Sequence, residues 1–518
     1  SFQLFPDDLD RLEWYIEDAM ARVPLLAQTG ISKVINGPIP YAPDGFPLVG
    51  PMPGVKNAFE ACVFTFGIAQ AGGAGKVLAE WIIEGSTDLD MWAIDPRRFT
   101  GHADQDYCNA KGLEVYCNEY AMHFPYHEWP QGRNKKLSPV HERILADGGQ
   151  MGCYNGWERA NWFAKDGDDT SEAATETWDR DGPWEVRVRE ECEAVRDGCG
   201  ILDLPGFSRF ALSGKGAGEW LLSKIAGQLP KVGRVALAYF PDHRGRIITE
   251  MSVLRHDEDE FTLITAAPAQ WHDFELLDRM LPDHLTLTDR TDEISTLIVC
   301  GPNARTLLSP LAEADLSRPW LSHQQAKVAG RPVTLARVCF AGELGWEIHA
   351  EMAEIPAIYV AVRAAGAVPF GMFALDRMRI EKGYRAWKGD LSTDYTLLEA
   401  GLDRFIRFDK PQEFPGRGAL LSEKQRGVQK RFVTLKVDAG AQDTPAMSSL
   451  YCGGEIVGEA TSGGWGYRVG ASLALAMVRT DRSDPGTALE VDIFGKRFAA
   501  TVQPDGPAWD PENARLRA

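Results

Sequence analysis

A glycine-rich segment near the start of the chain has residue types that could bring a ligand close to the backbone. It covers residues 67–75, which are predicted to form a turn between an apolar strand over 58–66 and a helix that ends at Gly85. Glycine lets the backbone approach a ligand, and a helix start offers unpaired N–H groups to an anion or a carbonyl. The segment predicts either a nucleotide-approach site or tight packing of the strand on the helix. In both cases the helix is expected to bury Val77, Leu78, Trp81 and Ile82.

The histidines and cysteines do not have the spacing of metal ligands. His123, His127 and Glu128 stand together without a third convincing ligand. The nine cysteines are scattered and contain no CxxC pair, which predicts reduced thiols in a reducing compartment. We therefore expect no metal site.

The composition is that of an ordinary globular protein. Of the 518 residues, 44% are hydrophobic and 25% are charged, and no long apolar run suggests a membrane span. This length predicts two to four domains. A formal net charge of -19 argues against nucleic acid as a partner, so an anionic small ligand would need local arginines.

Hydrophobic periodicity divides the chain into regions of different character. Residues 9–22 have apolar positions at helical spacing, whereas the Pro- and Gly-rich stretch 37–54 is expected to be a shaped loop. Residues 91–164 are aromatic-rich and show few periodic stretches, so they are expected to form a connecting domain. The charged run 165–182 predicts an exposed excursion.

The rest of the chain is richer in strand patterns. Short β-like runs alternate with helical ones over residues 184–420, which predicts an α+β domain. The last hundred residues are nearly all strand and turn, and they predict a small β-barrel or sandwich. The chain as a whole is expected to be an α+β multidomain protein.

The stretch upstream of the glycines resembles a known family of flavoproteins. It reads NGPIPYAPDGFPLVGPMPG and is similar to the NGP…TPDG…P-x-x-G segment that ends the catalytic domain of the glycine-oxidase-like flavoproteins. There the glycine-rich helix start faces the flavin ring. The resemblance implies FAD contacts at Gly67, Ile68, Ala69, Gly72 and Gly73.

No strand–GxGxxG–helix unit occurs in the chain. Residues 1–90 are therefore expected to be the C-terminal part of an FAD domain whose beginning lies upstream of Ser1. The 518 residues alone are then expected to hold no tightly bound FAD.

Three later stretches resemble the central domain of the dimethylglycine and sarcosine dehydrogenase family. They read DPRRFTGHADQDY, HFPYHEWPQGR and NGWERANWF, and they occur in the family's order. The chain departs from the family at residues 148–152, where it reads GGQMG for GAVFG, and at Ala160, where proline is usual. The resemblance implies a connecting domain over residues 91–165.

The third part of the chain resembles the aminomethyltransferase (T protein) of the glycine-cleavage system. The stretch GRVALAYFPDHRGRIITEMSVLR aligns Glu250 with the family's acid and Tyr239 with a tyrosine beside the folate. A carboxylate at this position could take up or balance a proton while an amine attacks an iminium carbon. The alternatives are a solvated strand residue for Glu250 and a core aromatic for Tyr239.

The stretch RVCFAGELGWE resembles the T protein's R-x-x-Y/F-x-G-E-x-G-aromatic-E motif. The resemblance implies folate contacts at Arg337 and Glu347, with Glu347 on the pterin. A carboxylate can accept two parallel N–H bonds from the 2-amino-pyrimidinone edge of a pterin.

Two more residues are implied by ALDRMRIEKGYRAWKGDLSTDYTLLEAGL, which resembles the T protein's L-R-L-E-x-G…T-P-x-E-A-G-L stretch. Arg379 aligns with the arginine that meets the benzoyl-glutamate end of folate, and Trp387 is a candidate stacking wall. The alternative for Arg379 is an ion pair on a helix surface. The closing stretch EIVGEATSGGWGYRVGASLALAMVR resembles the T protein's barrel.

Together the three resemblances imply a flavin-linked N-methylglycine dehydrogenase of the dimethylglycine/sarcosine dehydrogenase family. The implied domains are the FAD part (1–90), the connecting domain (91–165), a tetrahydrofolate-binding aminomethyltransferase-like domain (166–420) and a β-barrel (421–518). FAD would oxidise an N-methyl amine, and the one-carbon unit would pass to tetrahydrofolate inside the protein, which avoids its hydrolysis to formaldehyde.

The implied partners are a small N-methylated amine, an FAD domain or flavoprotein chain, and an electron acceptor, with an oligomer also possible. The expected location is bacterial cytoplasm, or the mitochondrial matrix in a eukaryote. Two rival functions stay open. One is a free-standing folate-dependent aminomethyltransferase; the other is a folate-binding subunit that docks on a separate flavoprotein through an apolar patch.

Overall fold

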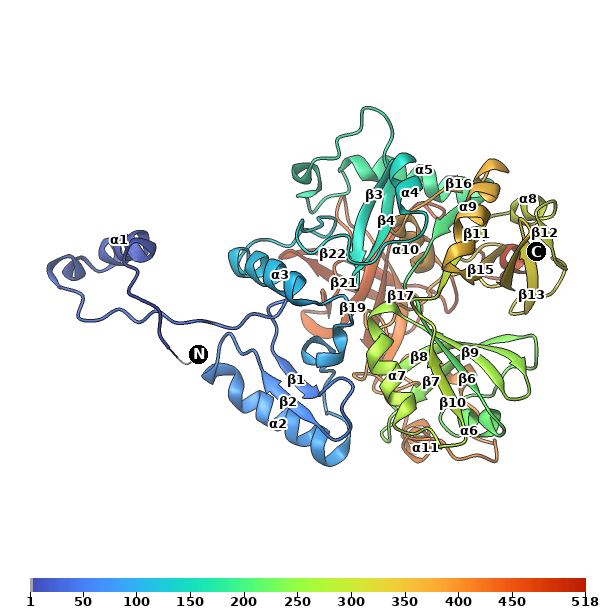
Figure 1. Cartoon of the computed structure of the whole chain (residues 1–518), viewed down its shortest axis with the longest axis horizontal. Coiled ribbons are helices and arrows are strands. Elements are labelled where there is room, and N and C mark those ends of the chain that lie inside the picture. Colours follow the sequence, from blue (N-terminus) through green and yellow to red (C-terminus); the bar gives the residue numbers. More distant parts are fainter. Residues whose placement is uncertain (1–2) are drawn as a thin grey trace.

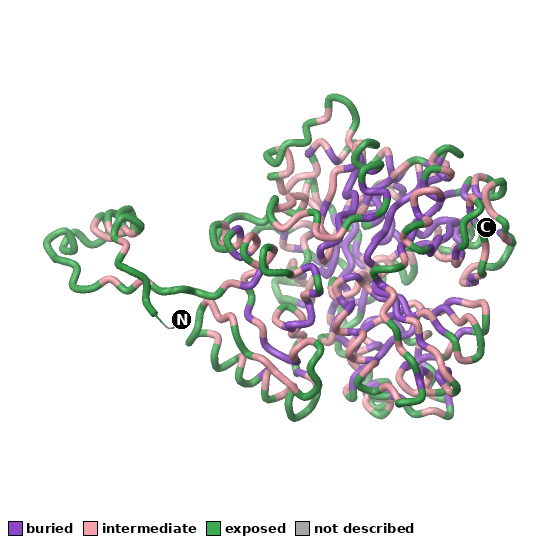
Figure 2. The backbone as a smooth tube through the Cα atoms, viewed as in Figure 1, coloured by how far each residue is buried: buried purple, intermediate pink, exposed green. Residues whose placement is uncertain are grey.

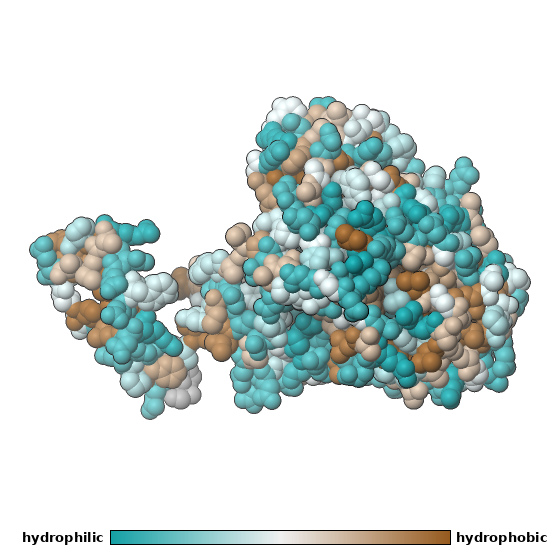
Figure 3. All heavy atoms as spheres, turned by 90° about the horizontal axis from the view of Figure 1, so that it is seen from above, coloured by the Kyte–Doolittle hydropathy of each residue, from teal (hydrophilic) through white to brown (hydrophobic). Residues whose placement is uncertain are grey.

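The first part of the chain is an arm that projects from the body of the protein (Figure 1). The computed structural model describes residues 3–518. The arm contains η1 (Asp10–Leu12), α1 (Glu13–Arg22) and η2 (Pro24–Gln28), and none of these elements has a buried residue. The helix predicted over 9–22 is confirmed. The arm carries brown, hydrophobic patches in Figure 3. Its exposed large apolar side chains include Leu4, Trp14, Tyr15, Leu25, Ile31, Ile35 and Ile39.

A small hairpin and a helix follow the arm. Strands β1 (Leu48–Pro51) and β2 (Phe59–Cys62) pair antiparallel, and α2 spans Ile68–Glu84. The strand predicted over 58–66 is thus shorter, and part of the predicted loop 37–54 is itself a strand. The predicted turn 67–75 is wrong beyond its first residue, because the helix begins directly after Gly67, whose φ of 45° only glycine adopts readily.

The connecting region has more regular structure than its sequence suggests. It contains η3 (Trp92–Ile94), η4 (Pro96–Arg98), α3 (Gln105–Cys117), α4 (His141–Ala146), and the hairpin of β3 (Gly149–Tyr154) and β4 (Trp157–Phe163). Helix α3 was missed because it has no apolar stripe; its start is instead fixed by the Asp104 side chain, which accepts from Tyr107 N. Every residue of β4 is buried. The run 165–182, with η5 (Glu172–Thr175), is largely exposed or half-buried.

Two sheets form the centre of the molecule, and we call residues 183–426 the two-sheet domain (Figure 1). The five-stranded sheet has the order β10 (Thr286–Asp289), β6 (Ser208–Ser213), β9 (Glu260–Thr265), β8 (Ile247–Asp257), β7 (Val235–Pro241). The seven-stranded sheet has the order β12 (Ala312–Glu313), β13 (His323–Val328), β14 (Arg331–Ala336), β15 (Gly345–Glu351), β11 (Ile294–Cys300), β5 (Gly200–Asp203), β16 (Val368–Pro369).

Helices cover one face of the five-stranded sheet and parts of both faces of the seven-stranded sheet, and they enclose the main hydrophobic cores, seen in purple in Figure 2. They are α5 (Pro183–Asp197), α6 (Ala217–Leu222), α7 (Gln270–Asp278), α8 (Ala304–Leu308), α9 (Ile355–Ala364), α10 (Met372–Glu381) and α11 (Arg417–Arg426), with the short turns η6 (Ala267–Ala269), η7 (Met352–Glu354) and η8 (Asp403–Phe405). Strand β8 shows the period of two that a half-covered sheet requires: Ile247, Thr249, Met251 and Val253 are buried, and the residues between them are largely half-buried.

The C-terminal region is a closed barrel, as the sequence predicted. Its strands follow the order β17 (Lys430–Val437), β20 (Ala471–Arg479), β19 (Glu455–Gly466), β18 (Ser449–Cys452), β21 (Ala488–Ile493), β22 (Lys496–Val502), with η9 (Thr480–Arg482) and a final α12 (Ala514–Arg517). The α+β multidomain fold class is confirmed. No helix within residues 3–518 has both the length and the apolar character needed to cross a bilayer.

Candidate active site

One face of the five-stranded sheet is left partly uncovered. Arg209, Ile264, Ser252 and Leu237 are register partners in turn across β6, β9, β8 and β7, so their side chains share this face. Leu237 is 38% exposed, although Val235 and Tyr239, on the same face of the same strand, are 6% and 2% exposed. The face is therefore open around Leu237 and closed at both ends. We call the space over Leu237 and Ser252 the recess.

Tyr239 and Glu250 stand at one end of the recess. They are direct register partners on β7 and β8, and the Tyr239 hydroxyl donates a hydrogen bond to the Glu250 carboxylate. Burial raises the pKa of Glu250, while the Tyr239 hydrogen bond and the nearby Arg385 charge act in the opposite direction. Glu250 nevertheless keeps some accessible surface. A carboxyl that is both desolvated and accessible lies at the bottom of a depression.

Arg385 lies beside this pair. Its guanidinium carbon is 4.1 Å from the centroid of the Phe432 ring, and its charge acts on both Tyr239 and Glu250. Burial lowers the pKa of Arg385. Its Nε is buried without a partner, and among residues 3–518 its guanidinium makes no hydrogen bond or ion pair to another side chain or carbonyl.

Aromatic side chains surround the same area. Phe405 lies against Tyr239, with ring centroids 5.1 Å apart. Phe340 and Tyr384 stack at 5.8 Å with an angle of 25°, and Phe340 remains 36% exposed. These rings come from three separate loops, and flat aromatic walls of this kind suit a planar ring ligand.

Glu347 lies at the other end of the recess, on β15. Its carboxylate is 3.4 Å from Nε2 of His349, whose Nδ1 is 2.9 Å from the Thr296 hydroxyl. Arg209 donates to the same hydroxyl, and the charge of Glu347 partly offsets the burial that lowers the pKa of Arg209 to about 10. Because Arg209 belongs to the row of residues under the recess, Glu347 and Glu250 face a common space.

Arg379 does not reach this space. Its guanidinium is held by Asp390 at 2.6 Å, by Asp376 at 2.8 Å and by the Ser462 hydroxyl at 2.9 Å. Asp390 also accepts a hydrogen bond from Ala386 N at 2.7 Å. Arg379 thus fixes the loop that carries Arg385 and Trp387, and its donors are already used by protein acceptors.

Arg337 is also engaged elsewhere. It donates to the Arg318 carbonyl at 3.1 Å and to the Ala518 carbonyl, and it lies over the Trp346 ring at 5.6 Å. Trp346 and Glu347 are consecutive on a strand, so their side chains point to opposite faces. The structure therefore does not bring Arg337 together with Glu347, and no contact supports it as a ligand residue.

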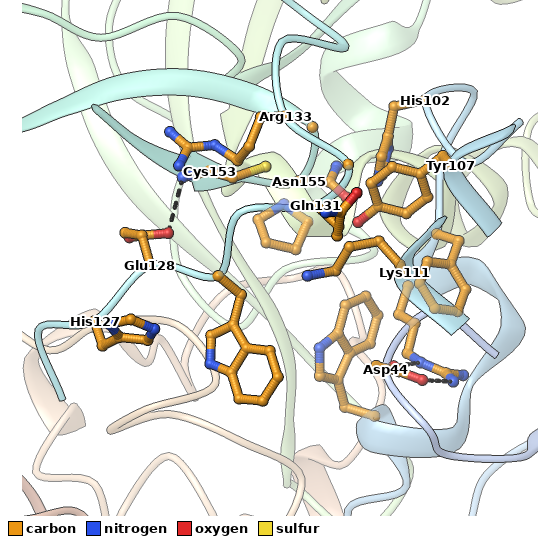
Figure 4. A pocket seen from close by; sticks show the side chains of 17 residues that line it. Asp44, His102, Tyr107, Lys111, His127, Glu128, Gln131, Arg133, Cys153 and Asn155 are labelled. Carbon is orange, nitrogen blue, oxygen red and sulfur yellow. Dashed lines mark hydrogen bonds and ion pairs between the residues drawn. The ribbon is translucent and has the colours of Figure 1, made fainter. Parts of the chain in front are cut away.

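Trp387 contacts a residue that lines a second space, separate from the recess. Its ring is 5.0 Å from that of Trp92, at 75°, and Trp92 lines a cavity of about 360 Å³ between the connecting region and the two-sheet domain. In Figure 4, Glu128, Arg133 and Cys153 lie on one side of this cavity, and Tyr107 and Lys111 on the other. Among the predicted folate residues, Trp387 is linked to this cavity by its ring contact with Trp92.

The cations around this cavity are already paired. Arg98 binds Asp44 at 2.6 Å, Lys111 binds Glu114, and Arg133 Nε binds Glu158 at 2.9 Å. Burial lowers the pKa of His102 to about 4, so this ring is neutral near pH 7. The cavity is thus lined by aromatic rings and neutralised ion pairs. In the described chain, no group of three or more His, Cys, Asp or Glu side chains is arranged to hold a metal ion.

The predicted flavin contacts lie at the outer start of α2. Ile68 is 96% exposed, and a Cβ placed on Gly67, Gly72 or Gly73 would meet nothing within 4 Å. Of the four side chains expected to be buried by this helix, Val77 is buried, Leu78 and Trp81 are half-buried, and Ile82 is 55% exposed. Tight packing of strand on helix does not explain these glycines, because their helix face is uncovered.

Sequence reasoning missed several residues of the recess. Arg385 stands two positions before Trp387 in the same stretch, but its type alone does not show that it lacks a partner. Leu237 alternates normally along β7 and was indistinguishable from a core residue. Arg209 comes from a segment that gave no signal beyond strand propensity, and Phe340 occupies the Y/F position of the RVCFAGELGWE motif but was not singled out.

Family models match most of the chain. The GCVT N-terminal domain matches residues 140–410, the glycine cleavage T-protein C-terminal barrel domain residues 430–510, and the FAD dependent oxidoreductase central domain residues 84–138. The chain belongs to the glycine cleavage T-protein family.

The relatives that match almost the whole of this chain include two mitochondrial dehydrogenases. Mitochondrial dimethylglycine dehydrogenase of Rattus norvegicus is 35% identical over 99% of this chain and 61% of its own length. Mitochondrial sarcosine dehydrogenase of Mus musculus is 30% identical over 100% of this chain and 62% of its own length. The resemblance drawn from the motifs is confirmed, and the chain spans about three fifths of these relatives.

A solved structure shares the fold. The crystal structure of the glycine cleavage system aminomethyltransferase T from Bartonella henselae aligns with a TM-score of 0.62 and 22% identity, covering 71% of this chain and 97% of that chain. The two-sheet domain and the barrel therefore have the aminomethyltransferase architecture.

Proposed function

We propose that the chain is the folate-side part of an FAD-dependent dehydrogenase of N-methylated amino acids such as dimethylglycine or sarcosine. It would move the one-carbon unit of the oxidised amine to tetrahydrofolate and give 5,10-methylenetetrahydrofolate and the demethylated amine. The observation that carries this proposal is the recess, with the hydrogen-bonded Tyr239–Glu250 pair at one end and Glu347 at the other.

The recess fits a reduced folate on three counts. Leu237 offers an apolar floor, and the aromatic rings of Phe340, Tyr384 and Phe405 can lie along a planar ligand. Glu347, half-buried, can accept two parallel N–H bonds from a pterin edge. Arg379 contributes by positioning the loop beside the recess, a different role from the one inferred from the family.

Glu250 has the properties required of a proton carrier in this transfer. The folate nitrogen attacks the carbon of the N-methylene amine, a new C–N bond forms, and the nitrogen loses its proton to Glu250. The proton then goes to the departing amine nitrogen as its C–N bond breaks. The second folate nitrogen attacks the same carbon and releases its own proton, which closes the 5,10-methylene bridge. The raised pKa of Glu250 brings it nearer to neutral pH, where a carboxyl can both accept and return a proton.

The flavin half of the reaction concerns the α2 region. Bound FAD would supply the oxidation of the N-methyl group. The uncovered glycine face of α2 and the exposed Phe66, Ile68, Ile82 and Ile83 fit a surface that a flavin-binding body covers. That body is either a further part of the same polypeptide or, in the rival function, a separate flavoprotein. Trp387 contacts Trp92, which lines the cavity of Figure 4 between the connecting region and the two-sheet domain.

Binding and turnover with matched variants test the proposal. Glu347→Gln should weaken the binding of tetrahydrofolate and of its pterin fragment by about ten- to a hundredfold in calorimetric titrations, because a charge-assisted hydrogen bond is lost. Glu351→Gln, an exposed change on the same strand, should leave both affinities unchanged. Glu250→Gln should keep folate binding and slow methylenetetrahydrofolate formation about 10²–10⁴-fold in the flavin-loaded protein. Unchanged folate affinity in Glu347→Gln would contradict the pterin assignment.

A further inference from the structure

Arg385, which is half-buried, differs from the buried arginines of the two-sheet domain in having no protein acceptor. Arg377 pairs with Asp443 at 2.6 Å, Arg379 with Asp390, and Arg209 with carbonyls and Thr296. Arg385 stacks on Phe432, and its Nε has no partner. A buried donor without an acceptor is costly, and a guanidinium has five N–H donors. The arrangement indicates that the acceptor is a ligand.

We infer that Arg385 binds the carboxylate of the amino acid that carries the one-carbon unit, beside Glu250. This inference rests on the proposed function. Phe432 covers one flat face of the guanidinium, which leaves its edge for in-plane hydrogen bonds. A carboxylate matches that edge with two parallel bonds, whereas a neutral carbonyl fills only one position.

The charge around Arg385 favours an anion. The nearby Arg404 adds a second positive charge that further lowers the pKa of Arg385. The carboxyl of Glu250 has a raised pKa, so it neutralises this charge less fully than an ordinary carboxylate would. Asp390, also near, is already taken by Arg379, Ala386 N, Thr461 and Ser462. An incoming carboxylate would therefore complete the charge balance.

The position of Arg385 beside the reacting groups favours the amino acid over the glutamate tail of folate as the source of this carboxylate. Arg385 acts on both members of the Tyr239–Glu250 pair, where the proposed transfer takes place. In an N-methylene amino acid the carboxylate stands two bonds from the reacting nitrogen. In folate the carboxylates are separated from the reacting nitrogens by the whole aminobenzoyl group. Arg404, exposed and electrostatically coupled to Arg385, is placed to meet that tail instead.

The consequence is substrate selection at the transfer site as well as at the flavin. One-carbon units on amino acids would be held beside Glu250, and those on simple amines without a carboxylate would not. The whole protein would then couple oxidation to folate only for N-methylated amino acids.

The test uses the 518-residue chain without flavin or folate, with glycine, sarcosine and methylamine as probes. Ligand-observed NMR titration measures their dissociation constants in the parent and in Arg385→Met, Arg385→Lys and Arg407→Met. Arg407 is an exposed arginine in the loop that follows η8 and serves as the matched control. Thermal melting of each variant confirms that it is folded.

We expect the parent and Arg407→Met to bind sarcosine and glycine at least about tenfold more tightly than methylamine. Arg385→Met should lose that preference, and Arg385→Lys should recover part of it, because lysine keeps the charge without the fork. Parent-like sarcosine binding by Arg385→Met would overturn the inference.

A second arm separates the two sources of carboxylate. Arg385→Met should bind tetrahydrofolate and tetrahydropteroate, which lacks the glutamate, as the parent does. A loss confined to tetrahydrofolate would overturn the inference in favour of a tail contact, and would leave the proposed function standing. Failure of the proposed function itself is measured separately, by the folate affinity of Glu347→Gln.

Discussion

Two arginines of this protein, Arg468 buried and Arg385 half-buried, have opposite surroundings. Arg468 is held by Glu343 at 2.9 Å, by Glu381, and by the carbonyls of Ala341 and Met378 at 2.9 and 2.7 Å. Arg385 is stacked on one ring and has no acceptor. The first joins the barrel to the two-sheet domain, and the second faces the recess. A guanidinium whose bonds are complete serves the fold, and one whose bonds are missing marks a place for a ligand.

Of the substitutions that test this comparison, Arg468→Met should have the largest effect on the free energy of unfolding. It would leave Glu381 without its counter-charge and Glu343 with Arg515 alone, and both carboxylate side chains are 1% exposed. Breaking a buried pair from one side costs about 3–5 kcal/mol, and we expect a loss of that size in denaturant unfolding. Arg479→Met, which removes exposed ion pairs, should cost less than about 1 kcal/mol. Equal losses in the two variants would show that burial does not distinguish these arginines.

Asp203 extends the comparison to a carboxyl. It is 5% exposed, neither oxygen has a well-formed hydrogen bond, and burial raises its pKa from 3.8 to about 7. The folded state then binds a proton more tightly than the unfolded state. Its stabilising contribution is complete below pH about 4 and is lost as pH rises to about 7.

Asp203→Asn should remove this pH dependence. The free energy of unfolding of the parent should fall relative to the variant by up to about 4 kcal/mol between pH 4 and 7, at about 1.4 kcal/mol per pKa unit. Denaturant titrations at several pH values measure the difference. Asp505→Asn, at an exposed position, should follow the parent throughout. Parallel curves for Asp203→Asn and the parent would contradict the shifted pKa.

Arg385→Met should have the smallest effect on stability. No ion pair is lost, and the cost of burying an unpaired charge is removed, so the free energy of unfolding should stay within about 1 kcal/mol of the parent or rise. The matched change Arg379→Met leaves the buried Asp390 without its counter-charge and should lower the free energy of unfolding by about 3 kcal/mol or more. A large loss in Arg385→Met would show that this arginine also serves the fold.

Tyr239 and Glu250 were expected as site residues because the sequence resembles the T protein, and strand pairing explains why they lie together. Tyr239 and Glu250 lie in two adjacent runs with alternating apolar residues, and pairing across a hairpin brings them opposite one another. The strands of the barrel and the helix over residues 9–22 could also be predicted from the sequence, because each depends on local hydrophobic periodicity.

The sequence did not distinguish arginines by their partners. Arg379 and Arg385 lie six residues apart in one stretch, yet the first binds Asp390 and Ser462 and the second faces the recess. Ser462 is far away in sequence, on β19, so this difference is a property of the tertiary structure. The prediction for the glycines of 67–75 was wrong for another reason. Glycine has a low helix propensity and so predicted a turn, but the uncovered face of α2 tolerates glycine inside a helix.

The contacts of Asp390 have a consequence for cooperativity. Its two oxygens bind Arg379 and Ala386 N on one side and Thr461 and Ser462 of the barrel on the other. A barrel that separates from its neighbour must therefore release a fully buried carboxylate and the arginine it neutralises. Local opening at this junction is as costly as the loss of a buried ion pair, so the barrel and the two-sheet domain should exchange their amide hydrogens as one unit, while the exposed arm before β1 exchanges freely.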